Sequence, residues 1–89
     1  MKLHLGCGRK LLDGYVNIDK YVVGEGIINL DILDLPYEES SVTEIVAEHV
    51  LEHIAFEHEK KFLEGAHQIL KKGGVLKIEV PDLEWVLTQ

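Results

Sequence analysis

The residues best suited to chemistry are Gly6, Cys7 and Gly8, which follow a short alternating stretch at the start of the chain. Because glycine has no Cβ atom, a Gly-x-Gly turn after a strand can adopt positive φ and bring the backbone close to a ligand. The alternative is an ordinary tight turn between strands. Cys7 has no histidine beside it in the motif to activate its thiol, so we predict a small side chain behind the turn, not a nucleophile.

Acidic residues recur where later alternating stretches end. Asp19 and Asp31 close the second and third, and Glu48 closes the fourth. In an open α/β sheet, ligands bind at the carboxyl ends of strands where the strand order reverses, so we expect these carboxylates beside the glycine turn. A carboxylate accepts hydrogen bonds from hydroxyl groups, and acidic groups attract cations and disfavour phosphates. The cluster therefore predicts a site for a cationic, hydroxyl-bearing small molecule.

Five histidines offer further chemistry. An imidazole titrates near neutral pH, so His49 is a candidate general base for an acceptor hydroxyl. His49, Glu52 and His53 also spell H-x-x-E-H, the pattern of some zinc proteases. No third ligand is evident, so we predict no metal and a structural role for His53, and zinc is the disfavoured alternative. The remaining histidines are predicted to be surface or partly buried bystanders: His4, His58 and His67.

Composition narrows the class of protein. The 89 residues, 46% of them hydrophobic, suffice for one domain over 1–89. Sixteen acidic against nine basic residues give a formal charge of −7, which disfavours nucleic-acid binding. No stretch approaches the roughly 20 apolar residues of a membrane span, the start lacks a signal-peptide pattern, and the single cysteine suits a reducing compartment. We expect a cytoplasmic chain that binds neither nucleic acid nor membrane.

Alternating strands and helices would position the candidate residues. The apolar pattern predicts strands over 2–6, about 15–19, about 27–31, about 44–48 and 75–80. Each strand has a more polar side, which indicates one buried face and one wet face. The links between the first three strands are too short for ordinary crossover helices. Together these features predict a two-layer α/β fold.

Helices are predicted in the second half of the chain. The clearest covers about 56–72, with acids early, bases late and Gly73-Gly74 as its end. A shorter helical piece is predicted over 49–55. Asp82 is placed as the N-cap of a C-terminal helix. Its apolar residues, with an exposed edge on the fifth strand, predict self-association: Leu83, Trp85, Val86 and Leu87.

Six short motifs follow one another along the chain: Leu-Gly-Cys-Gly (5–8), Gly-Tyr-Val-Asn-Ile-Asp (14–19), Asp-Ile-Leu-Asp-Leu-Pro-Tyr (31–37), Val-Leu-Glu-His (50–53), Ile-Leu-Lys-Lys-Gly-Gly (69–74) and Ile-Glu-Val-Pro-Asp (78–82). In this order they resemble the Rossmann-like S-adenosylmethionine-dependent methyltransferases, and most closely the small subset with a very short link between the first two strands. The resemblance covers nearly the whole chain. It implies a mainly parallel five-stranded sheet in the order 3-2-1-4-5, truncated relative to the family's seven strands.

The resemblance also implies roles for the candidate residues. The turn at residues 6–8 would lie under the methionine part of S-adenosylmethionine. Asp19 would hold the ribose hydroxyls, and Asp31 with the backbone of Ile32 would contact the adenine. Glu48 would lie beside the methyl donor, together with the candidate base described above.

The function implied by the resemblance is transfer of a methyl group from S-adenosylmethionine to an oxygen or nitrogen of a small-molecule or glycan-type acceptor. Because only five strands are matched, much of the acceptor wall is missing. A cofactor-binding or interaction module without turnover is therefore the alternative. A dinucleotide site is disfavoured because its fingerprint needs a third glycine where this chain has Leu11.

Overall fold

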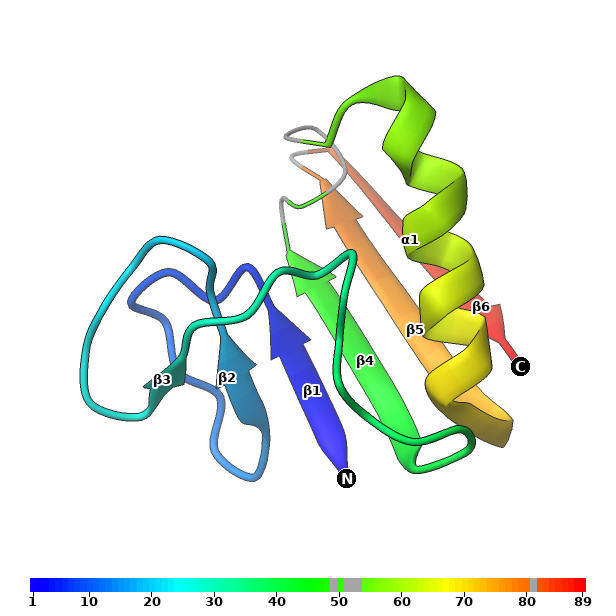
Figure 1. Cartoon of the computed structure of the whole chain (residues 1–89), viewed down its shortest axis with the longest axis horizontal. Helices are drawn as coiled ribbons and strands as arrows, with labels where there is room; N and C mark the ends of the chain where they lie inside the picture. Colours follow the sequence, from blue (N-terminus) through cyan, green and yellow to red (C-terminus); the bar gives the residue numbers. More distant parts are fainter. Residues whose placement is uncertain (49, 51–53, 81) are drawn as a thin grey trace.

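The computed structural model describes residues 1–48, 50, 54–80 and 82–89. They form one six-stranded sheet and a long helix (Figure 1). In chain order the elements are β1 (Lys2–Leu5), β2 (Val16–Ile18), β3 (Ile27–Ile28), β4 (Val42–Glu48), α1 (Phe56–Ile69), β5 (Leu70–Val80) and β6 (Leu83–Thr88). The predicted α/β class is confirmed, with one strand more than expected.

The strands lie in the order β3-β2-β1-β4-β5-β6. β1 pairs in parallel with β2 on one side and with β4 on the other, and β3 and β5 continue the parallel pairing outward. The predicted order 3-2-1-4-5 is therefore confirmed. The chain leaves β1 in one direction and returns to its other side at β4, so the strand order reverses between these two neighbours, where ligands bind in such sheets.

The prediction of a C-terminal helix after Asp82 is wrong, because residues 83–88 form the antiparallel strand β6. Its partners on β5 are Val80 for Leu83, Ile78 for Trp85 and Leu76 for Leu87. A helix of about two turns is marginal in water, whereas a strand here satisfies the backbone groups along the edge of β5. The predicted exposed edge on the fifth strand is also wrong, since the outer edge belongs to β6.

Helix α1 ends at Ile69, three residues before its predicted end. Leu70 already pairs with Val42, and Gly73 and Gly74 lie inside β5 instead of stopping the helix. Gly73 N–H donates to the carbonyl of Gln89 (3.1 Å), and Gln89 N–H donates to the carbonyl of Gly74 (2.8 Å). Pairing with β4 and with the C-terminus thus converts the end of the predicted helix into strand. The helical piece predicted over 49–55 falls mostly outside the described residues.

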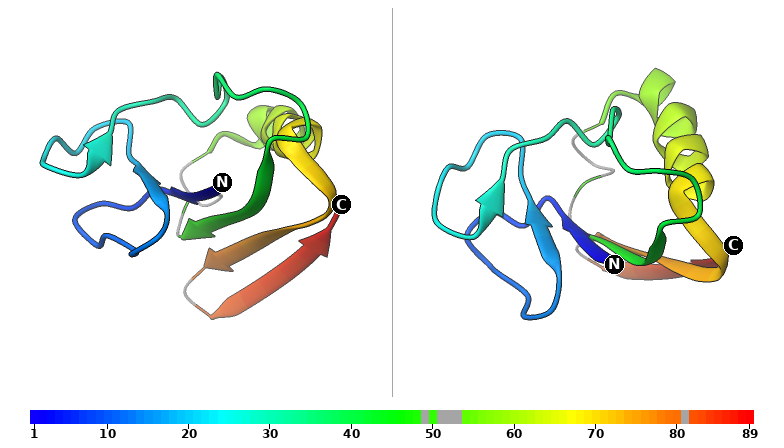
Figure 2. Two further views of the ribbon diagram at one scale, coloured as in Figure 1. Left: turned by 90° about the horizontal axis from the view of Figure 1, so that it is seen from below. Right: turned by 60° about the horizontal axis from the view of Figure 1, so that its bottom comes forward.

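The core lies between the sheet and α1, which covers one face (Figure 2). Helical spacing places Phe62, Ala66 and Ile69 on one stripe of α1, and all three are buried. They pack in one cluster with alternate residues of the central strands: Leu3, Leu5, Ile18, Ile45, Ala47, Leu76 and Ile78. Burying a side chain as large as Phe62 contributes about 1.5–3 kcal/mol, so this cluster holds α1 on the sheet.

The opposite face carries no helix among the described residues, yet its centre is not wet as predicted. His4 is 0% exposed and Asn17 7%. The loop between β1 and β2 folds over them: the Tyr15 ring lies 5.5 Å from the Lys2 ammonium, and the Tyr15 hydroxyl donates to Glu44. The prediction that His4 lies at the surface or is only partly buried is therefore wrong. The alternation of apolar and polar residues along a strand identifies its polar face, but it does not predict whether a loop covers that face.

No helix in the described part of the chain is long and apolar enough to cross a bilayer.

Candidate functional site

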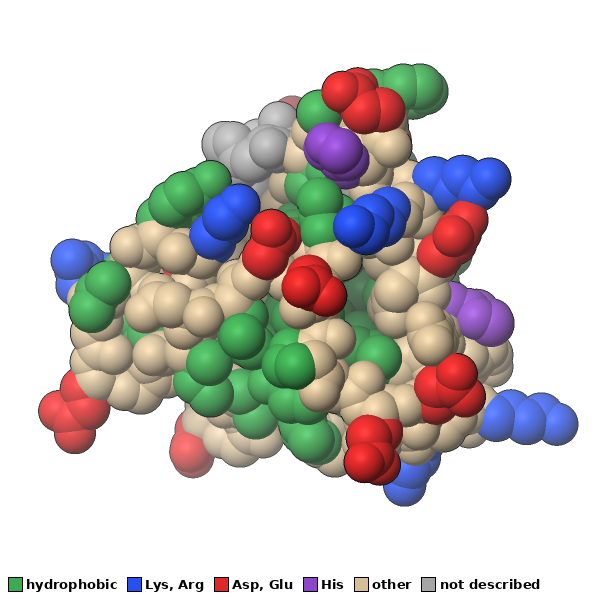
Figure 3. Space-filling model, viewed as in Figure 1, with side chains coloured by type: hydrophobic (Ala, Val, Ile, Leu, Met, Phe, Trp, Pro, Cys, Tyr) green, Lys and Arg blue, Asp and Glu red, His purple; other side chains and the backbone are tan. Residues whose placement is uncertain are grey.

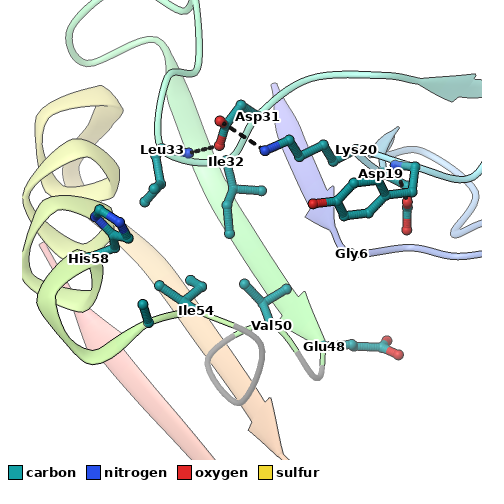
Figure 4. A pocket seen from close by; sticks show the side chains of 12 residues that line it. Gly6, Asp19, Lys20, Asp31, Ile32, Leu33, Glu48, Val50, Ile54 and His58 are labelled. Carbon is teal, nitrogen blue, oxygen red and sulfur yellow. Dashed lines mark hydrogen bonds and ion pairs between the residues drawn. The ribbon is translucent and has the colours of Figure 1, made fainter.

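A pocket of about 860 Å³ opens where the carboxyl ends of β1, β2 and β4 meet the segment after β3 (Figure 4). Its walls combine acidic, basic and apolar side chains. In the space-filling view, acidic and basic groups surround apolar surface near the middle of this face (Figure 3). The lining residues are Gly6, Asp19, Lys20, Tyr21, Asp31, Ile32, Leu33, Glu48, Val50, Ile54, Ala55 and His58.

The turn after β1 requires glycine at position 6. The φ of Gly6 is +65°, and a Cβ added there would lie 2.6 Å from Val50 Cγ2 and 3.0 Å from the carbonyl oxygen of Glu48. Gly8 also has positive φ, +55°, but a Cβ there would meet no atom within 4 Å. Gly6 therefore serves both conformation and close packing, whereas Gly8 serves conformation alone.

Asp19 ties this turn to the end of β2. Its Oδ2 accepts a hydrogen bond from Gly8 N–H (2.9 Å), and its Oδ1 accepts bonds from Tyr21 N–H (2.9 Å) and Val22 N–H (2.8 Å). A carboxylate has about four acceptor positions, so the three amides leave one, on Oδ2. The carboxylate thus fixes the glycine turn and has one acceptor position on Oδ2 beyond the three amide bonds.

The three amides also keep Asp19 ionised. Burial alone would raise the pKa of Asp19, but the N–H groups of Val22, Tyr21 and Gly8 outweigh it and lower the pKa below its usual value. The neighbouring thiol shifts in the other direction, because burial and then the charge of Asp19 raise the pKa of Cys7. Cys7 is 4% exposed and stays a neutral thiol behind the turn.

Asp31 stands at the far side of the pocket. Its Oδ1 accepts a bond from Leu33 N–H (2.9 Å), and its Oδ2 lies 3.4 Å from Lys20 Nζ. The Leu33 amide first, and then Lys20, lower the pKa of Asp31 against the opposing effect of burial. Ile32 and Leu33 follow directly and place apolar side chains in the pocket (Figure 4). This end of the pocket therefore combines a carboxylate with apolar walls.

Glu48 ends β4 next to the turn, with a side chain that is 14% exposed. Both of its carboxylate oxygens lie 3.4 Å from Lys10 Nζ. On the other side its Oε1 lies 3.4 Å from Nε2 of His4. Glu48 is thus held between an exposed cation and a buried imidazole.

The pocket brings together most of the residues predicted to bind a cofactor. Those that line it are Gly6, Asp19, Asp31, Ile32 and Glu48. Cys7 and Gly8 shape the turn behind it. The candidate base His49, and the residues Glu52 and His53 of the zinc alternative, lie outside the described residues. Among the residues that the structure describes, no group of three or more His, Cys, Asp or Glu side chains could hold a metal ion.

Sequence reasoning missed part of the wall. Lys20 and Leu33 were adjacent to predicted site residues, and that adjacency was the available signal. Ile54 and His58 reach the pocket from the start of the α1 region (Figure 4). His58 had been predicted to be a bystander. No local pattern marks these two, because the fold brings them to the pocket.

The sequence profile of the family described as "Methyltransferase domain" matches residues 3–78 of the chain. No sequence among curated proteins matches it.

Three solved structures share the fold. One is a complex between the Haloferax volcanii Trm112 methyltransferase activator and a candidate methyltransferase, with 23% sequence identity and a TM-score of 0.65. The second is a SAM-dependent methyltransferase of Archaeoglobus fulgidus, with 16% identity and a TM-score of 0.68. The third is a candidate S-adenosyl-L-methionine-dependent methyltransferase of Methanococcus maripaludis, with 14% identity and a TM-score of 0.66. Each match covers 86% of this chain. It covers 43%, 42% and 46% of the matched chain in the first, second and third structure. The chain therefore spans less than half the length of these structural relatives.

Proposed function

The chain belongs to the methyltransferase domain family, and on that premise we propose that its pocket binds S-adenosylmethionine for methyl transfer. The acceptor that we propose is an oxygen or nitrogen nucleophile of a small molecule or glycan. The observation that carries the proposal is the glycine turn, held by Asp19 at the edge of a pocket of about 860 Å³. That volume lies within the usual range for small-molecule sites.

The backbone at Gly6 fits a ligand that must come close to the sheet. A side chain there would collide with Val50 and Glu48, so the space above the turn depends on the absence of a Cβ atom. Together with the acidic groups around it, this opening favours a nucleoside that carries a positive charge over one that carries phosphates.

Asp19 fits the ribose. Its remaining acceptor position on Oδ2 can take one hydroxyl without breaking any of the three amide bonds. Accepting both ribose hydroxyls at once, one on each oxygen, would require Oδ1 to release Tyr21 or Val22. We therefore assign one ribose hydroxyl to this carboxylate.

The apolar walls beyond Asp19 fit the adenine. Ile32 and Leu33 on one side, with Val50 and Ile54 nearby, offer flat apolar contact. Asp31 stands next to them as an acceptor for the exocyclic amine. Its weak surface pairing with Lys20, at 3.4 Å and largely exposed, leaves it available.

S-adenosylmethionine supplies a methyl group on a cationic sulfur, from which an acceptor nucleophile displaces a neutral thioether. The contribution of the chain is positioning: a fixed turn, an ionised Asp19 and a carboxylate at Glu48 orient the nucleoside and favour its positive charge. A proton leaving the acceptor passes to solvent or to a base. His49 is our candidate for that base.

Calorimetric titration with S-adenosylmethionine and with its demethylated product, S-adenosylhomocysteine, tests the binding step. We expect both to bind at one site per chain. Asp19→Asn is expected to weaken both, whereas the exposed Asp13→Asn is the matched control and is expected to leave affinity unchanged. Failure of the wild-type chain to bind either nucleoside contradicts the proposal.

Turnover is tested separately, by transfer of a labelled methyl group to panels of hydroxyl and amine acceptors. A methylated product establishes the enzyme activity. Binding without turnover would favour the module without turnover, or an enzyme whose acceptor wall or activator comes from another chain. One structural neighbour comes from a complex with an activator protein, so that second outcome has a precedent in the fold.

A further inference from the structure

His4 is a fully buried imidazole that the site described above does not use. It lies on β1, on the sheet face opposite α1, where alternation places it next to Asn17 of β2. Its Nδ1 lies 2.8 Å from Asn17 Oδ1, and its Nε2 lies 3.4 Å from Glu48 Oε1. The ring therefore links Asn17, on this face of the sheet, to the carboxylate of Glu48, a residue at the edge of the pocket.

The hydrogen bonds of Asn17 decide which nitrogen of His4 carries a proton. Asn17 Nδ2 donates to the carbonyls of Leu12 and Tyr15, both at 3.2 Å. Its Oδ1 accepts from Leu12 N–H at 3.0 Å. A flipped amide would set its oxygen against two carbonyls and its amine against an N–H donor, so the orientation is fixed. Oδ1 can only accept, and His4 Nδ1 must therefore donate.

The other ring nitrogen then faces Glu48. Among the described residues, Nε2 is the buried side-chain atom that has no hydrogen-bond partner. A bare Nε2 lone pair directed at a carboxylate oxygen would be repulsive, and an unpartnered buried nitrogen costs free energy. A proton on Nε2 removes both penalties, and a small rotation of the Glu48 carboxylate would complete the bond.

We propose that His4 is a positioning residue which, fixed as the Nδ1–H donor by Asn17, directs a second N–H, on Nε2, at Glu48 and holds that group as a carboxylate at the edge of the pocket. The charged or polar groups next to the pair are Asn17 on β2, Lys10 on the exposed side of Glu48, and Glu79 on β5, which is the register partner of Glu48. Held in this way, Glu48 is the group that distinguishes the sulfonium of S-adenosylmethionine from the neutral thioether of S-adenosylhomocysteine. This second step rests on the proposed function.

Two variants at His4 test the contributions of its two ring nitrogens separately. His4→Asn keeps a donor near the position of Nδ1, for the bond to Asn17, and removes the group that faces Glu48. His4→Gln places an amide nitrogen near the position of Nε2 and is the conservative variant. Glu48→Gln removes the charge of the carboxylate and keeps its shape.

The measurement is the ratio of the dissociation constants for the two nucleosides, from calorimetry on the full chain. We expect Glu48→Gln to reduce the preference for the sulfonium about tenfold, the size of one partly screened charge contact. His4→Asn is expected to reduce this preference by a similar factor. Combining His4→Asn with Glu48→Gln should reduce it no further than either variant alone, because His4 acts through Glu48. His4→Gln should restore most of the preference. A purely structural role for His4 would weaken both nucleosides equally and leave the ratio unchanged.

Imidazole ¹⁵N NMR of the wild-type chain tests the first step without any variant. We expect Nδ1 of His4 to carry a proton whether or not a nucleoside is bound. A ring protonated only at Nε2 overturns the proposal even if every variant folds.

The outcomes also separate this inference from the proposed function. If the wild-type chain binds neither nucleoside, the proposed function fails and the recognition step fails with it. If both bind and Glu48→Gln leaves their ratio unchanged, the proposed function stands and the inference is wrong.

Discussion

Replacing Gly6 by alanine perturbs the turn that the pocket is built on, and its cost can be worked out from the structure. An L-residue at φ +65° costs about 1–2 kcal/mol. The new Cβ would also lie 2.6 Å from Val50 Cγ2 and 3.0 Å from the Glu48 carbonyl oxygen, and forcing a methyl group into a packed site costs about 1–3 kcal/mol more. We therefore expect Gly6→Ala to lower the free energy of unfolding by about 2–5 kcal/mol.

Gly8→Ala is the matched control, because it has almost the same backbone strain without the collision. Its φ is +55° and no atom lies within 4 Å of an added Cβ, so we expect a loss of only about 1–2 kcal/mol. The difference between the variants, about 1–3 kcal/mol, corresponds to a difference in Tm of about 4–24 °C for a domain of this size. Urea denaturation followed by far-ultraviolet circular dichroism measures both free energies.

A third variant isolates the contact with the Val50 side chain. Adding Val50→Ala to Gly6→Ala removes the nearer of the two colliding atoms, so the double variant is expected to be more stable than the sum of the single losses by about 1 kcal/mol. Equal destabilisation by Gly6→Ala and Gly8→Ala, together with strict additivity in this cycle, would refute the argument that Gly6 is required for close packing.

Three other perturbations test the site and the open edge of the sheet. Because the folded-state pKa of Asp19 is lowered, its contribution to stability is complete above its unfolded value of about 3.9 and is lost as the pH falls through the folded-state value. We expect Asp19→Asn to lower the free energy of unfolding by about 1.5–3 kcal/mol at pH 7 and by progressively less below about pH 4, as measured by denaturation curves. A loss that does not depend on pH would contradict hydrogen bonding of these amides to an ionised carboxylate. Asp31→Asn is expected to weaken S-adenosylhomocysteine binding by about 0.5–1 kcal/mol in calorimetry. It is also expected to reduce the preference of the protein for this nucleoside over its inosine analogue. An undiminished preference would show that Asp31 does not recognise the adenine. The wild-type chain is expected to show concentration-dependent mass in light scattering through β6, and Trp85→Lys to suppress it, while a monomer at all concentrations would argue against self-association.

The sequence was sufficient for the parallel part of the sheet. Short alternating stretches such as Leu3-His4-Leu5 and Val16-Asn17-Ile18 mark strands that are too closely spaced to have helices between them. The resemblance supplied the strand order. The strand pattern itself predicted that Asp19, Asp31 and Glu48 lie at one edge, because the carboxyl ends of parallel strands share an edge of the sheet.

The sequence could not predict features decided by tertiary competition. The segment from Leu83 has a capped, helix-like start, yet pairing along the long edge of β5 prevails. The two roles of Asp19, as a lock for the turn and an acceptor for a ligand, depend on amides of three different residues whose directions no pattern records. The burial of His4 depends in the same way on a loop that folds over an apparently polar face.

The two strands at the β3 end of the sheet are its shortest. β2 has three residues and β3 two, and within the described residues β3 pairs with β2 alone. Their amides should exchange with deuterium well before those of β4 and β5, because few bonds must break to open them locally. A nucleoside that contacts Gly6, Asp19 and Asp31 would connect the carboxyl ends of β1, β2 and β3 and hinder their local opening. Slower exchange along β2 and β3 upon ligand addition, with β5 unchanged, would then report occupancy of the pocket residue by residue.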